Sequence, residues 1–271
     1  MKIMEKRVGF IGAGNMASAL ISGMISAGFK PENIIASSPG KSHLEILSNE
    51  FSVKTSNNNE LVFKESEVII FAVKPNVLKD VLDEYQNLAC EGKVLISVAA
   101  GYKISDIEDI LSPEEKIIRA MPNTPTSIGS GVTAISLNKN VESCDKQDAE
   151  NLFSCVGKVV HIQEKEMDLY TALIGSGPAY VFYLIESLLD ASSQIKLDEK
   201  TKKNMISSMI SGSSKLALMS EHSPKKLREN VTSPGGVTQR AIEEFEKNGM
   251  KKIIIDAIEA AASKSKELGD N

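Results

Sequence analysis

The feature that most constrains this sequence is a glycine-rich turn close to its start. The short apolar run Val8–Ile11 is followed by Gly12, Gly14 and Ala17, which occupy the three small-residue positions of the pattern G-x-G-x-x-G/A. The first glycine of that pattern permits a tight turn, the second lets backbone approach a pyrophosphate, and the third small residue lets a helix pack close to the strand. The sequence therefore predicts a strand, a turn and a helix whose N-terminus binds the phosphates of a dinucleotide. A glycine turn without a ligand is the alternative, and the position of this turn after a first strand and before an amphipathic helix favours the dinucleotide.

Short apolar runs alternate with amphipathic ones from residue 7 to residue 160, which is typical of βαβ units. Several of these runs, such as Val68–Val73, are continuously apolar, as parallel strands covered by helices on both faces need to be. We predict an α/β fold for this half, with a Rossmann-like, doubly wound parallel sheet. The predicted strands are Arg7–Ile11, Asn33–Ser37, Glu67–Val73, Lys93–Ala99, Lys116–Ala120, Gly131–Ser136 and Lys158–Ile162.

The end of the second predicted strand indicates which dinucleotide is bound. NAD sites usually place an Asp or Glu about 20 residues after the glycines, where it holds the ribose 2′-hydroxyl. The stretch from Asn33 to Lys41 contains no acid, while Ser37 and Ser38 offer hydroxyls and Lys41 offers a cation to a 2′-phosphate. The sequence thus favours NADPH and leaves NADH open as a second donor. The alternative is that these are ordinary turn residues, above all Lys41.

Three loops follow predicted strands and should reach the carboxyl edge of the sheet, where ligands bind in such folds. These loops are Ala72–Pro75, Ala99–Gly101 and Ala120–Pro125. The predicted cofactor-binding residues are Gly12, Ala13, Gly14, Asn15, Met16, Ser37, Ser38, Asn58, Ala72, Val73, Lys74, Pro75, Ala99, Ala100, Gly101, Met121 and Asn123.

Beyond residue 163 the strand signals end and long helical patterns take over. The stretch Leu169–Ser192 is apolar almost all round, and a helix without a polar face is buried on every side. A small group of helices can hardly bury such a helix alone, because small domains bury less of their surface. We therefore predict an NADP-binding domain over residues 1–163 and a helical substrate-binding and dimerisation domain over residues 164–271, in which two chains interlock. The other predicted helices are Asp198–Ser220, Pro224–Asn230, Thr238–Asn248 and Lys251–Leu268.

Composition and charge argue against several other classes of protein. The formal net charge of -5 disfavours nucleic acid, which usually attracts a basic patch. No stretch approaches the run of about 20 apolar residues that spans a bilayer, and the apolar run after Arg7 is too short for a signal peptide. The three cysteines, Cys90, Cys144 and Cys155, form no CxxC pair, and the histidines have no ligand spacing. We therefore expect no metal site, and buried or inert thiols in a reducing cytoplasm.

Motifs along essentially the whole chain resemble one family. Phe10–Ala17, Ala72–Pro75 and Arg119–Pro125 in the first half, with Gly175–Tyr180 and Val231–Gly236 in the second, resemble pyrroline-5-carboxylate reductase in order and spacing. The two later motifs are much more specific than the glycine turn. The resemblance implies an N-terminal dinucleotide domain and a C-terminal helical domain that interlocks into homodimers, which often assemble into decamers. It also implies reduction of 1-pyrroline-5-carboxylate to L-proline by hydride transfer from NADPH, the last step of proline biosynthesis.

By the same resemblance, the loop Ser233–Thr238 would hold the substrate carboxylate. Gly235 and Gly236 precede a predicted helix, and small residues there expose backbone N–H groups to an anion. Thr238 can add a hydroxyl hydrogen bond, and its other option is a plain N-cap. Glu164 matches a family position beside the imino acid and would favour the cationic imine, whereas taken alone it is typical of a solvated surface charge. The predicted catalytic residues are Thr238 and Glu164, and the predicted substrate-binding residues are Asn230, Ser233, Gly235, Gly236, Val237 and Thr238.

Some positions depart from the family pattern and concern substrate fit and interface packing. They are Ala191–Ser193, Ser208–Met209, Ser223–Pro224, Leu227–Glu229 and Val237. The anion loop itself is intact.

The sequence leaves the proton donor and two other functions open. The proton would come from solvent, from the hydroxyl of Thr238 or Tyr180, or with help from Glu164. A related cyclic-imine or β-hydroxy-acid reductase is one alternative, although the latter would need a catalytic lysine on the helix Leu169–Ser192, which has none. A non-catalytic NADP-binding sensor is the other, and it would not need the Ser-Pro-Gly-Gly loop.

Overall fold

The computed structural model describes residues 6–86 and 92–269. Its internal contacts divide the chain into two compact units, one formed by Met1–Ser176 with Ala260–Asn271 and the other by Gly177–Glu259. The first unit therefore includes the beginning of the helical half and the end of the last helix. The boundary between residues 163 and 164 remains our proposal for where the two functions divide, because the last strand ends just before it.

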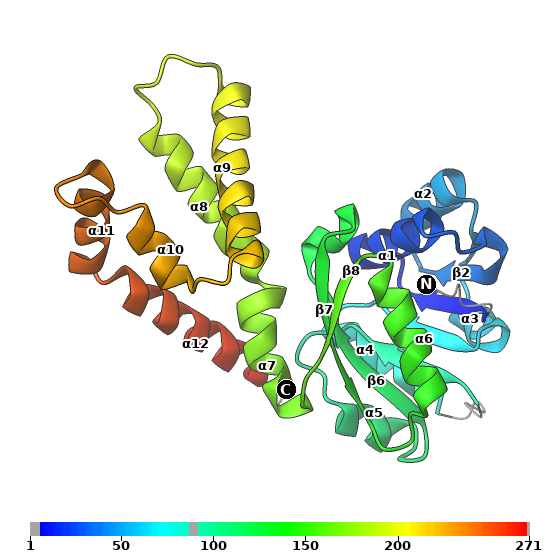
Figure 1. The fold of residues 1–271 in the computed structure, drawn as a ribbon. Coiled ribbons are helices and arrows are strands. Elements are labelled where there is room, and N and C mark those ends of the chain that lie inside the picture. The colour runs from blue at the N-terminus through cyan, green and yellow to red at the C-terminus, as the bar shows by residue number, and fades with distance from the viewer. Residues whose placement is uncertain (1–5, 87–91, 270–271) are drawn as a thin grey trace. The chain divides into compact units, whose positions relative to one another are not determined.

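The first unit is built on an eight-stranded sheet (Figure 1). The strand order is β3-β2-β1-β4-β5-β6-β7-β8, so the chain crosses over between β3 and β4 and creates a switch point beside β1. Strands β1 to β6 are parallel, which confirms the predicted doubly wound sheet, and β7 is antiparallel to β6 and parallel to β8. The strands are β1 (Val8–Ile11), β2 (Ile34–Ser37), β3 (Lys54–Ser56), β4 (Val68–Phe71), β5 (Val94–Ser97), β6 (Lys116–Met121), β7 (Gly131–Leu137) and β8 (Gly157–His161).

Two features of the sheet differ from the prediction. Strand β7 reverses direction because residues 122–130 contain only the 3-10 turn Thr124–Ile128, whereas a parallel return needs a crossover of about a dozen residues or more. Strand β3 is not predicted because Lys54–Ser56 is a polar segment at the edge of the sheet and lacks an apolar run.

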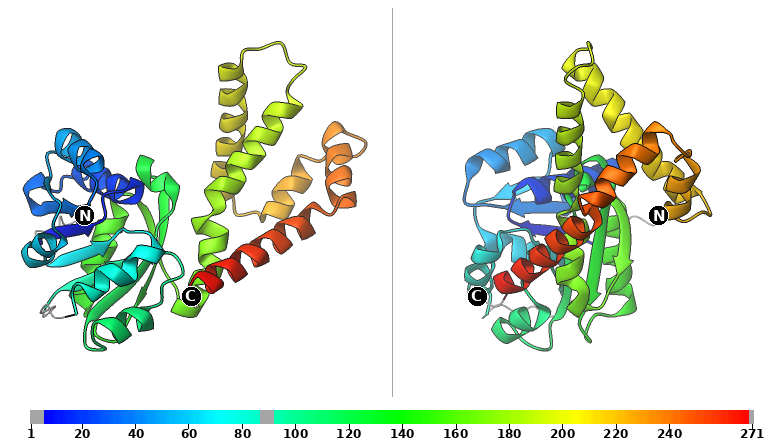
Figure 2. Two further views of the ribbon diagram at one scale, coloured as in Figure 1. Left: turned by 180° about the vertical axis from the view of Figure 1, so that it is seen from behind. Right: turned by 90° about the vertical axis from the view of Figure 1, so that its left-hand side faces the viewer.

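Helices cover both faces of this sheet, as Figure 2 also shows. They are α1 (Asn15–Ser26), α2 (Lys41–Phe51), α3 (Asn59–Glu65), α4 (Pro75–Asp83), α5 (Ile104–Ile110) and α6 (Ser143–Ser154). Side chains that alternate along a strand point to opposite faces. Phe10 and Ile70 accordingly join one core with α1, α2 and α6, while Ile69 and Phe71 join a second core with α3, α4 and α5. The sheet is thus packed on both sides, and its loops at the carboxyl edge are left to bind ligands.

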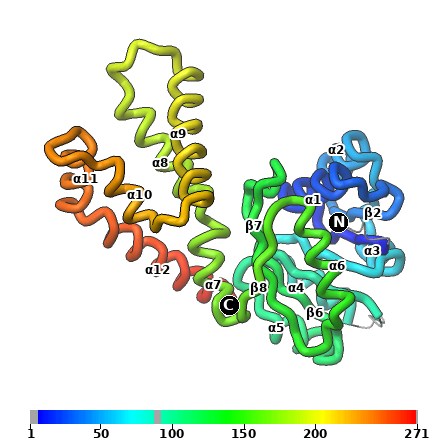
Figure 3. Tube along the Cα trace, in the orientation of Figure 1, coloured from blue at the N-terminus to red at the C-terminus, as the bar shows by residue number. Residues whose placement is uncertain are grey.

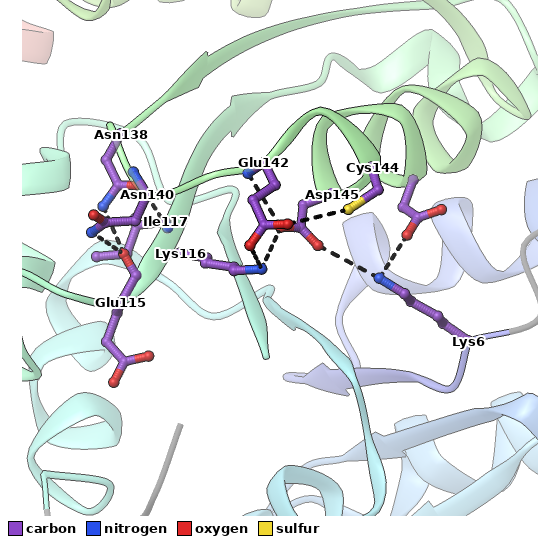
Figure 4. Close-up of polar contacts among 10 residues, drawn as sticks. Lys6, Glu115, Lys116, Ile117, Asn138, Asn140, Glu142, Cys144 and Asp145 are labelled. Atoms are coloured by element: carbon purple, nitrogen blue, oxygen red, sulfur yellow. Dashed lines mark hydrogen bonds and ion pairs between the residues drawn. The ribbon is translucent and has the colours of Figure 1, made fainter. Parts of the chain in front are cut away.

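An ion-pair cluster fixes α6 to the sheet (Figure 4). Asp145 in the first turn of α6 is buried, and its carboxylate lies 2.8 Å from Nζ of Lys116 and 3.5 Å from Nζ of Lys6. Burial alone would raise the pKa of Asp145, but the hydrogen bonds from Lys116 and from the backbone of Glu142, with the nearby ammonium charges, hold that pKa below its usual value. Hydrogen bonds to Asp145 and Glu142 in turn raise the pKa of Lys116. Both partners are therefore held in their charged forms.

The second unit is formed by helices whose bounds lie close to the predicted ranges (Figure 3). The chain reaches it through α7 (Met167–Tyr170) and a π-helical turn at Thr171–Gly175. Side-chain caps begin two of its helices, since Asp198 accepts the N–H of Thr201 and Ser223 accepts the N–H of Lys226. The helices are α8 (Gly177–Ala191), α9 (Glu199–Met219), α10 (Pro224–Asn230), α11 (Val237–Lys247) and α12 (Met250–Gly269), the last of which continues into the first unit.

Within one chain the apolar helix α8 is not buried on every side, which agrees with the prediction that a single helical domain cannot bury it alone. Phe182 is 60% exposed and Tyr183 is 71% exposed. Indeed, no apolar side chain between Gly177 and Glu259 is buried in the described structure. Since burial of apolar surface is the main force that stabilises a fold, these helices need a further apolar surface to cover them.

One helical segment is long and apolar enough to cross a membrane, which corrects the expectation that no such segment exists. The segment Glu164–Ala191 is 28 residues long and reaches a mean hydropathy of 1.4 in its most apolar window, 6% of which is buried. The sequence criterion counted uninterrupted apolar residues and passed over this helix because it includes glycines, serines and a threonine. By length and composition alone, the helix fits a protein interface as well as a bilayer.

Candidate functional site

Gly12 ends β1 at a position where only glycine fits. Its φ is 102°, and a Cβ there would lie 2.5 Å from the carbonyl oxygen of Ala72. The N–H of Gly12 donates to the carbonyl of Ser37 at 2.9 Å, and the N–H of Ala72 donates to the carbonyl of Ile11 at 2.8 Å. The predicted cofactor residues Gly12, Ser37 and Ala72 therefore lie together at the carboxyl edge of the sheet.

The N-terminus of α1 is open to an anion. Gly14 is its N-cap residue, makes no side-chain cap, and a Cβ there would meet nothing within 4 Å. The first turn of α1, which begins with Asn15 and Met16, contains no acidic residue. Because the first N–H groups of a helix have no partner within it, Gly12–Met16 forms a backbone cradle that fits a pyrophosphate.

The loop Ala72–Pro75 ends β4 and begins α4. Lys74 is the N-cap residue of α4 with extended backbone, and Pro75 is the first helical residue. Proline at this position lacks an N–H that would have had no helical partner, and its fixed φ suits the first turn. The sequence thus fixes the point at which the loop becomes a helix.

A cleft of about 570 Å³ opens between the end of β2 and α4, beside the glycine turn. Its lining combines apolar side chains, several of them from α4, with serines and asparagines and with two acidic residues on the α4 side, Asp80 and Glu84. The apolar part suits a purine base, and the serines and asparagines suit a sugar with its phosphate. The cleft, called here the β2–α4 cleft, is lined by Ile11, Gly12, Ser37, Ser38, Pro39, Asn57, Asn58, Asn59, Val73, Val77, Asp80, Val81 and Glu84.

The residues predicted to hold a 2′-phosphate differ in what their side chains offer. Ser37 is fully buried, and its hydroxyl donates to Oδ1 of Asn59 at 2.7 Å. Ser38 is only half-buried, and Asn58 caps α3 with its Oδ1, so this cap does not use its amide NH₂ group; both residues line the cleft. Lys41 at the start of α2 is exposed and does not line the cleft. Ser38 and Asn58 therefore suit the phosphate better than Ser37 and Lys41.

The loop Ala99–Gly101 follows β5 and packs against the end of α12. The N–H of Ala99 donates to the hydroxyl of Ser97 at 3.3 Å. Gly101 has a φ of 79°, and a Cβ there would lie 3.1 Å from the carbonyl oxygen of Ser265. The position therefore requires glycine both for its conformation and for this close approach.

The loop after β6 is held by the side chain of Asn123, which is nearly buried. Its Oδ1 accepts the N–H of Val132 at 2.9 Å, and its Nδ2 donates to the carbonyl of Ile174 at 3.1 Å. Next to it, Met121 packs so closely that a Cβ on Gly175 would lie 3.0 Å from the Met121 methyl carbon. Asn123 thus joins the sheet edge to the π-helical turn, so its amide positions this loop.

Glu164 lies in an ion-pair network and is not a solvated surface charge. Its Oε1 accepts the N–H of Ile104 at 2.7 Å and lies 3.3 Å from Nη1 of Arg119, a buried residue of β6. Asp168 lies 3.7 Å from Nη2 of the same guanidinium and accepts the hydroxyl of Ser265 at 2.8 Å. Within the described chain, the second carboxylate oxygen of Glu164 has no such partner, and the side chain is 32% exposed.

The second predicted anion loop lies in the other unit. Gly235 has a φ of 71°, and its N–H donates to Oε1 of Gln239 at 2.6 Å. Gly236 is the N-cap residue of α11, without a side-chain cap, so Thr238 is not the N-cap and its exposed hydroxyl stands in the first turn. Ser233 accepts the N–H of Gly236 at 3.0 Å, and Asn230 is the last residue of α10. The N–H groups of Gly235 and Gly236 are thus already engaged within the loop, and those of Val237 and Thr238 at the start of α11 are the ones open to a carboxylate.

Each cradle is formed within its own unit. Gly12–Met16 belongs to the first unit and Ser233–Thr238 to the second. That they face one another across a shared cleft, within one chain or between partners, stays a prediction.

The group Glu142, Cys144 and Asp145 brings together side chains of the kinds that bind metal ions. Among the residues described, these are the side chains whose ligand atoms lie within 4.8 Å of one another. Lys116 places its ammonium 3.0 Å from Glu142 and 2.8 Å from Asp145, so an ion pair already occupies the point where a cation would lie. The group is explained by its role in fixing α6.

The cysteines fit the expectation of inert thiols only in part. Burial raises the pKa of Cys155 to about 11, which keeps its thiol protonated. Cys144 is exposed, and Cys90 lies outside the described residues.

No role was predicted from the sequence for three side chains that shape the site, Arg119, Asn59 and Glu84. Arg119 could have been found, because a charged residue inside the apolar strand Lys116–Met121 indicates a buried cation that needs partners. Asn59 and Glu84 gave no such signal, since both lie in polar stretches and meet only through the fold.

The family models agree with the division of the sequence into a nucleotide half and a helical half. Residues 164–268 match the model described as pyrroline-5-carboxylate reductase dimerisation, and residues 7–101 match the model described as NADP oxidoreductase, coenzyme F420-dependent.

Curated relatives and solved structures are similar over the full length. The pyrroline-5-carboxylate reductase of Methanosarcina acetivorans is 37% identical over 98% of this chain and 98% of its own. Pyrroline-5-carboxylate reductase 1 of Bacillus subtilis is 35% identical over 98% of this chain and 91% of its own. The crystal structure of the pyrroline carboxylate reductase of Plasmodium falciparum with NADP bound aligns with a TM-score of 0.91 and 35% identity, covering 99% of this chain and 100% of that one.

Proposed function

Because the chain belongs to the pyrroline-5-carboxylate reductase family, we propose that it reduces 1-pyrroline-5-carboxylate to L-proline with NADPH as the hydride donor. The observation that carries this proposal is the full-length similarity together with two intact anion cradles, Gly12–Met16 and Ser233–Thr238. The first suits a diphosphate and the second a small carboxylate.

The residues of the first unit fit the dinucleotide. A Cβ at Gly12 would fill the turn, the N-terminus of α1 is uncapped by side chains, and the β2–α4 cleft is open beside both. In this proposal Gly12–Met16 hold the pyrophosphate, and Ser38 with Asn58 hold the ribose phosphate. The loops Ala72–Pro75, Ala99–Gly101 and Met121–Asn123 position the remainder. When bound, NADPH supplies the hydride that reduces the imine carbon.

The residues of the second unit bind and orient the imino acid. The carboxylate accepts hydrogen bonds from the backbone N–H groups of Val237 and Thr238 at the start of α11 and from the Thr238 hydroxyl. Gly235 and Gly236 shape the turn, with Ser233 and Asn230 beside them. Fixing this end of a small ring sets the position of the imine carbon, and such positioning contributes much of the rate in reactions between two bound partners.

Glu164 is proposed to stabilise the positive charge of the protonated imine with its second carboxylate oxygen. The first oxygen is held by Ile104 and Arg119, which fixes the direction of the carboxylate. An imine accepts hydride best when its nitrogen is protonated, and a nearby carboxylate favours that form. We assign the proton itself to solvent, because Thr238 is exposed and its hydroxyl is a weak acid.

We further propose that the chain forms a homodimer through its helical half, with decamers as the larger assembly, and that it is cytoplasmic. The exposed apolar side chains of α8 support the dimer, since a second copy would bury them. In this arrangement the helix Glu164–Ala191 faces protein and not lipid.

The test is the loss of NADPH absorbance with 1-pyrroline-5-carboxylate, with related cyclic imines and with a β-hydroxy acid. We expect the highest kcat/KM for 1-pyrroline-5-carboxylate. NADPH binding without turnover of any of these compounds would support a non-catalytic sensor. A higher kcat/KM for another imine would indicate a related cyclic-imine reductase instead.

Thr238→Ala tests the carboxylate loop. Loss of a hydrogen bond to a charged group should raise KM for the imine about tenfold or more while the Kd of NADPH stays constant. Thr238→Ser is the matched control, because it keeps the hydroxyl and should keep KM near the wild-type value. A fall in NADPH affinity in Thr238→Ala would show that the loop is misassigned.

A further inference from the structure

The β2–α4 cleft carries negative charge where a phosphate is expected. Asp80 and Glu84, both on the α4 side, line it, and no lysine or arginine does so in the described structure. Lys41, which the sequence offers as the cation for a 2′-phosphate, is not part of the lining. A preference between cofactors in this cleft therefore has to rest on something other than a lysine or arginine of its lining.

A chain of two hydrogen bonds joins Glu84 to the end of β2. The Ser37 hydroxyl donates to Oδ1 of Asn59 at 2.7 Å, and Nδ2 of Asn59 donates to Oε2 of Glu84 at 3.3 Å. Ser37 is the last residue of β2, the place at which NAD-binding folds present an acid to the ribose 2′-hydroxyl. Here a carboxylate is linked to this place from a different element, the end of α4.

The Asn59 amide presents its NH₂ group to Glu84 and its oxygen to Ser37. A carboxylate accepts hydrogen bonds only, so it must meet the NH₂ side of the amide, and this leaves the amide oxygen for the Ser37 hydroxyl. The reverse orientation would bring the amide oxygen against the carboxylate. The carboxylate of Glu84 is thereby linked through Asn59 to Ser37, which lines the same cleft.

We propose that Glu84 sets the preference of this enzyme between NADPH and NADH, because its carboxylate repels the 2′-phosphate that distinguishes the two. This inference rests on the proposed function and names a specificity-determining residue for it. A 2′-phosphate carries up to two negative charges, whereas the 2′-hydroxyl of NADH carries none. Glu84 thus weakens the binding of NADPH and lets NADH compete for the same cleft.

The decisive experiment measures the Kd of NADP⁺ and of NAD⁺ by titration calorimetry for the wild type, Glu84→Gln and Asp83→Asn. Asp83 neighbours Glu84 at the end of the same helix and is exposed, but it does not line the cleft, so Asp83→Asn is a control for charge removal alone. We expect Glu84→Gln to tighten NADP⁺ binding by roughly three- to tenfold at low salt, an effect that shrinks as salt screens the charges. The Kd of NAD⁺ should stay within about twofold in every variant, and Asp83→Asn should leave both values near wild type.

A second variant tests the direction of the effect. Asn59→Asp places a carboxylate beside the Ser37 hydroxyl and should weaken NADP⁺ binding more than NAD⁺ binding. Equal changes for both dinucleotides in Glu84→Gln, or equal changes in Glu84→Gln and Asp83→Asn, would overturn the role of Glu84.

Imine reduction by the wild type is measured in parallel, because it tests the proposed function and not the role of Glu84. If the wild type reduces the imine but Glu84→Gln keeps the wild-type ratio of NADP⁺ to NAD⁺ affinity, only the role of Glu84 is overturned. A wild type that binds neither dinucleotide would overturn both.

Discussion

Arg119→Met removes the buried cation that holds several elements of the first unit together. The guanidinium lies on β6 and is 3% exposed. Through Glu164 it reaches the first turn of α5, and through Asp168 and Ser265 it reaches the end of α12, which packs on Gly101. The substitution keeps a long apolar stem in place but leaves two carboxylates without their partner.

The expected cost follows from how far water can reach those carboxylates. Removing one partner of a fully buried ion pair costs about 3–5 kcal/mol. The side chains of Glu164 and Asp168 are 32% and 25% exposed, so water recovers part of that loss. In addition, Nη2 of Arg119 has no hydrogen bond, which means that the native network is itself incompletely satisfied. We therefore expect a loss of about 2–4 kcal/mol, which for a chain of this size lowers the Tm by about 4–8 °C.

The assay is thermal unfolding followed by circular dichroism, at one fixed protomer concentration because association stabilises the folded state. Lys54→Met is the control, since Lys54 pairs with Glu65 at 2.7 Å but is 51% exposed, and such surface pairs contribute at most about 1 kcal/mol. Arg119→Lys should fall between the two variants, because it keeps the charge and loses the two-armed geometry. A Tm for Arg119→Met that matches that of Lys54→Met would refute the claim that this network stabilises the cofactor edge.

Two further predictions concern the pH dependence of stability and the state of assembly. The folded-state pKa of Asp145 is lowered, so its carboxylate stabilises the fold above its unfolded-state pKa of about 4 and loses that effect as the pH falls through the lowered value. Asp145→Asn should therefore lower the free energy of unfolding by about 2 kcal/mol at neutral pH, and this difference from wild type should narrow in acid. Urea midpoints measured across the pH range would show it, and a difference that stays constant with pH would contradict it. Phe182→Asp places a charge on the exposed apolar face of α8 and should shift the sedimentation coefficient from oligomer to monomer, whereas a wild type that is already monomeric at micromolar concentration would contradict the interface.

Most strands of the first unit were predictable because their own residues specify them locally. Runs such as Val68–Phe71 are apolar throughout, and they lie in the centre of the sheet. The direction of β7 was not predictable from its own residues, because it depends on how short the segment before it is. A polar edge strand such as β3 leaves no pattern of its own.

The side-chain contacts of the β2–α4 cleft could not be predicted from the sequence. The sequence predicts Ser37 as a residue that contacts the ribose phosphate, and in the fold this residue lines the β2–α4 cleft. Its hydroxyl nevertheless faces Asn59, because rotamers and partners depend on residues brought together from separate elements. Glu84 reaches the same place from α4, so a search for an acid near the end of β2 could not find it.

The exposed apolar face of α8 implies that substrate binding depends on assembly more than cofactor binding does. The first unit has two apolar cores of its own, formed on the two faces of its sheet, so its cofactor cradle does not need a partner in order to fold. The second unit has no buried apolar side chain in the single chain, and it carries the loop Ser233–Thr238. The Phe182→Asp monomer should therefore keep NADP⁺ binding close to wild type while its imine reduction falls steeply, because the carboxylate loop loses the support of its helices. Equal loss of both functions would mean instead that the cofactor unit, too, depends on the interface for its stability.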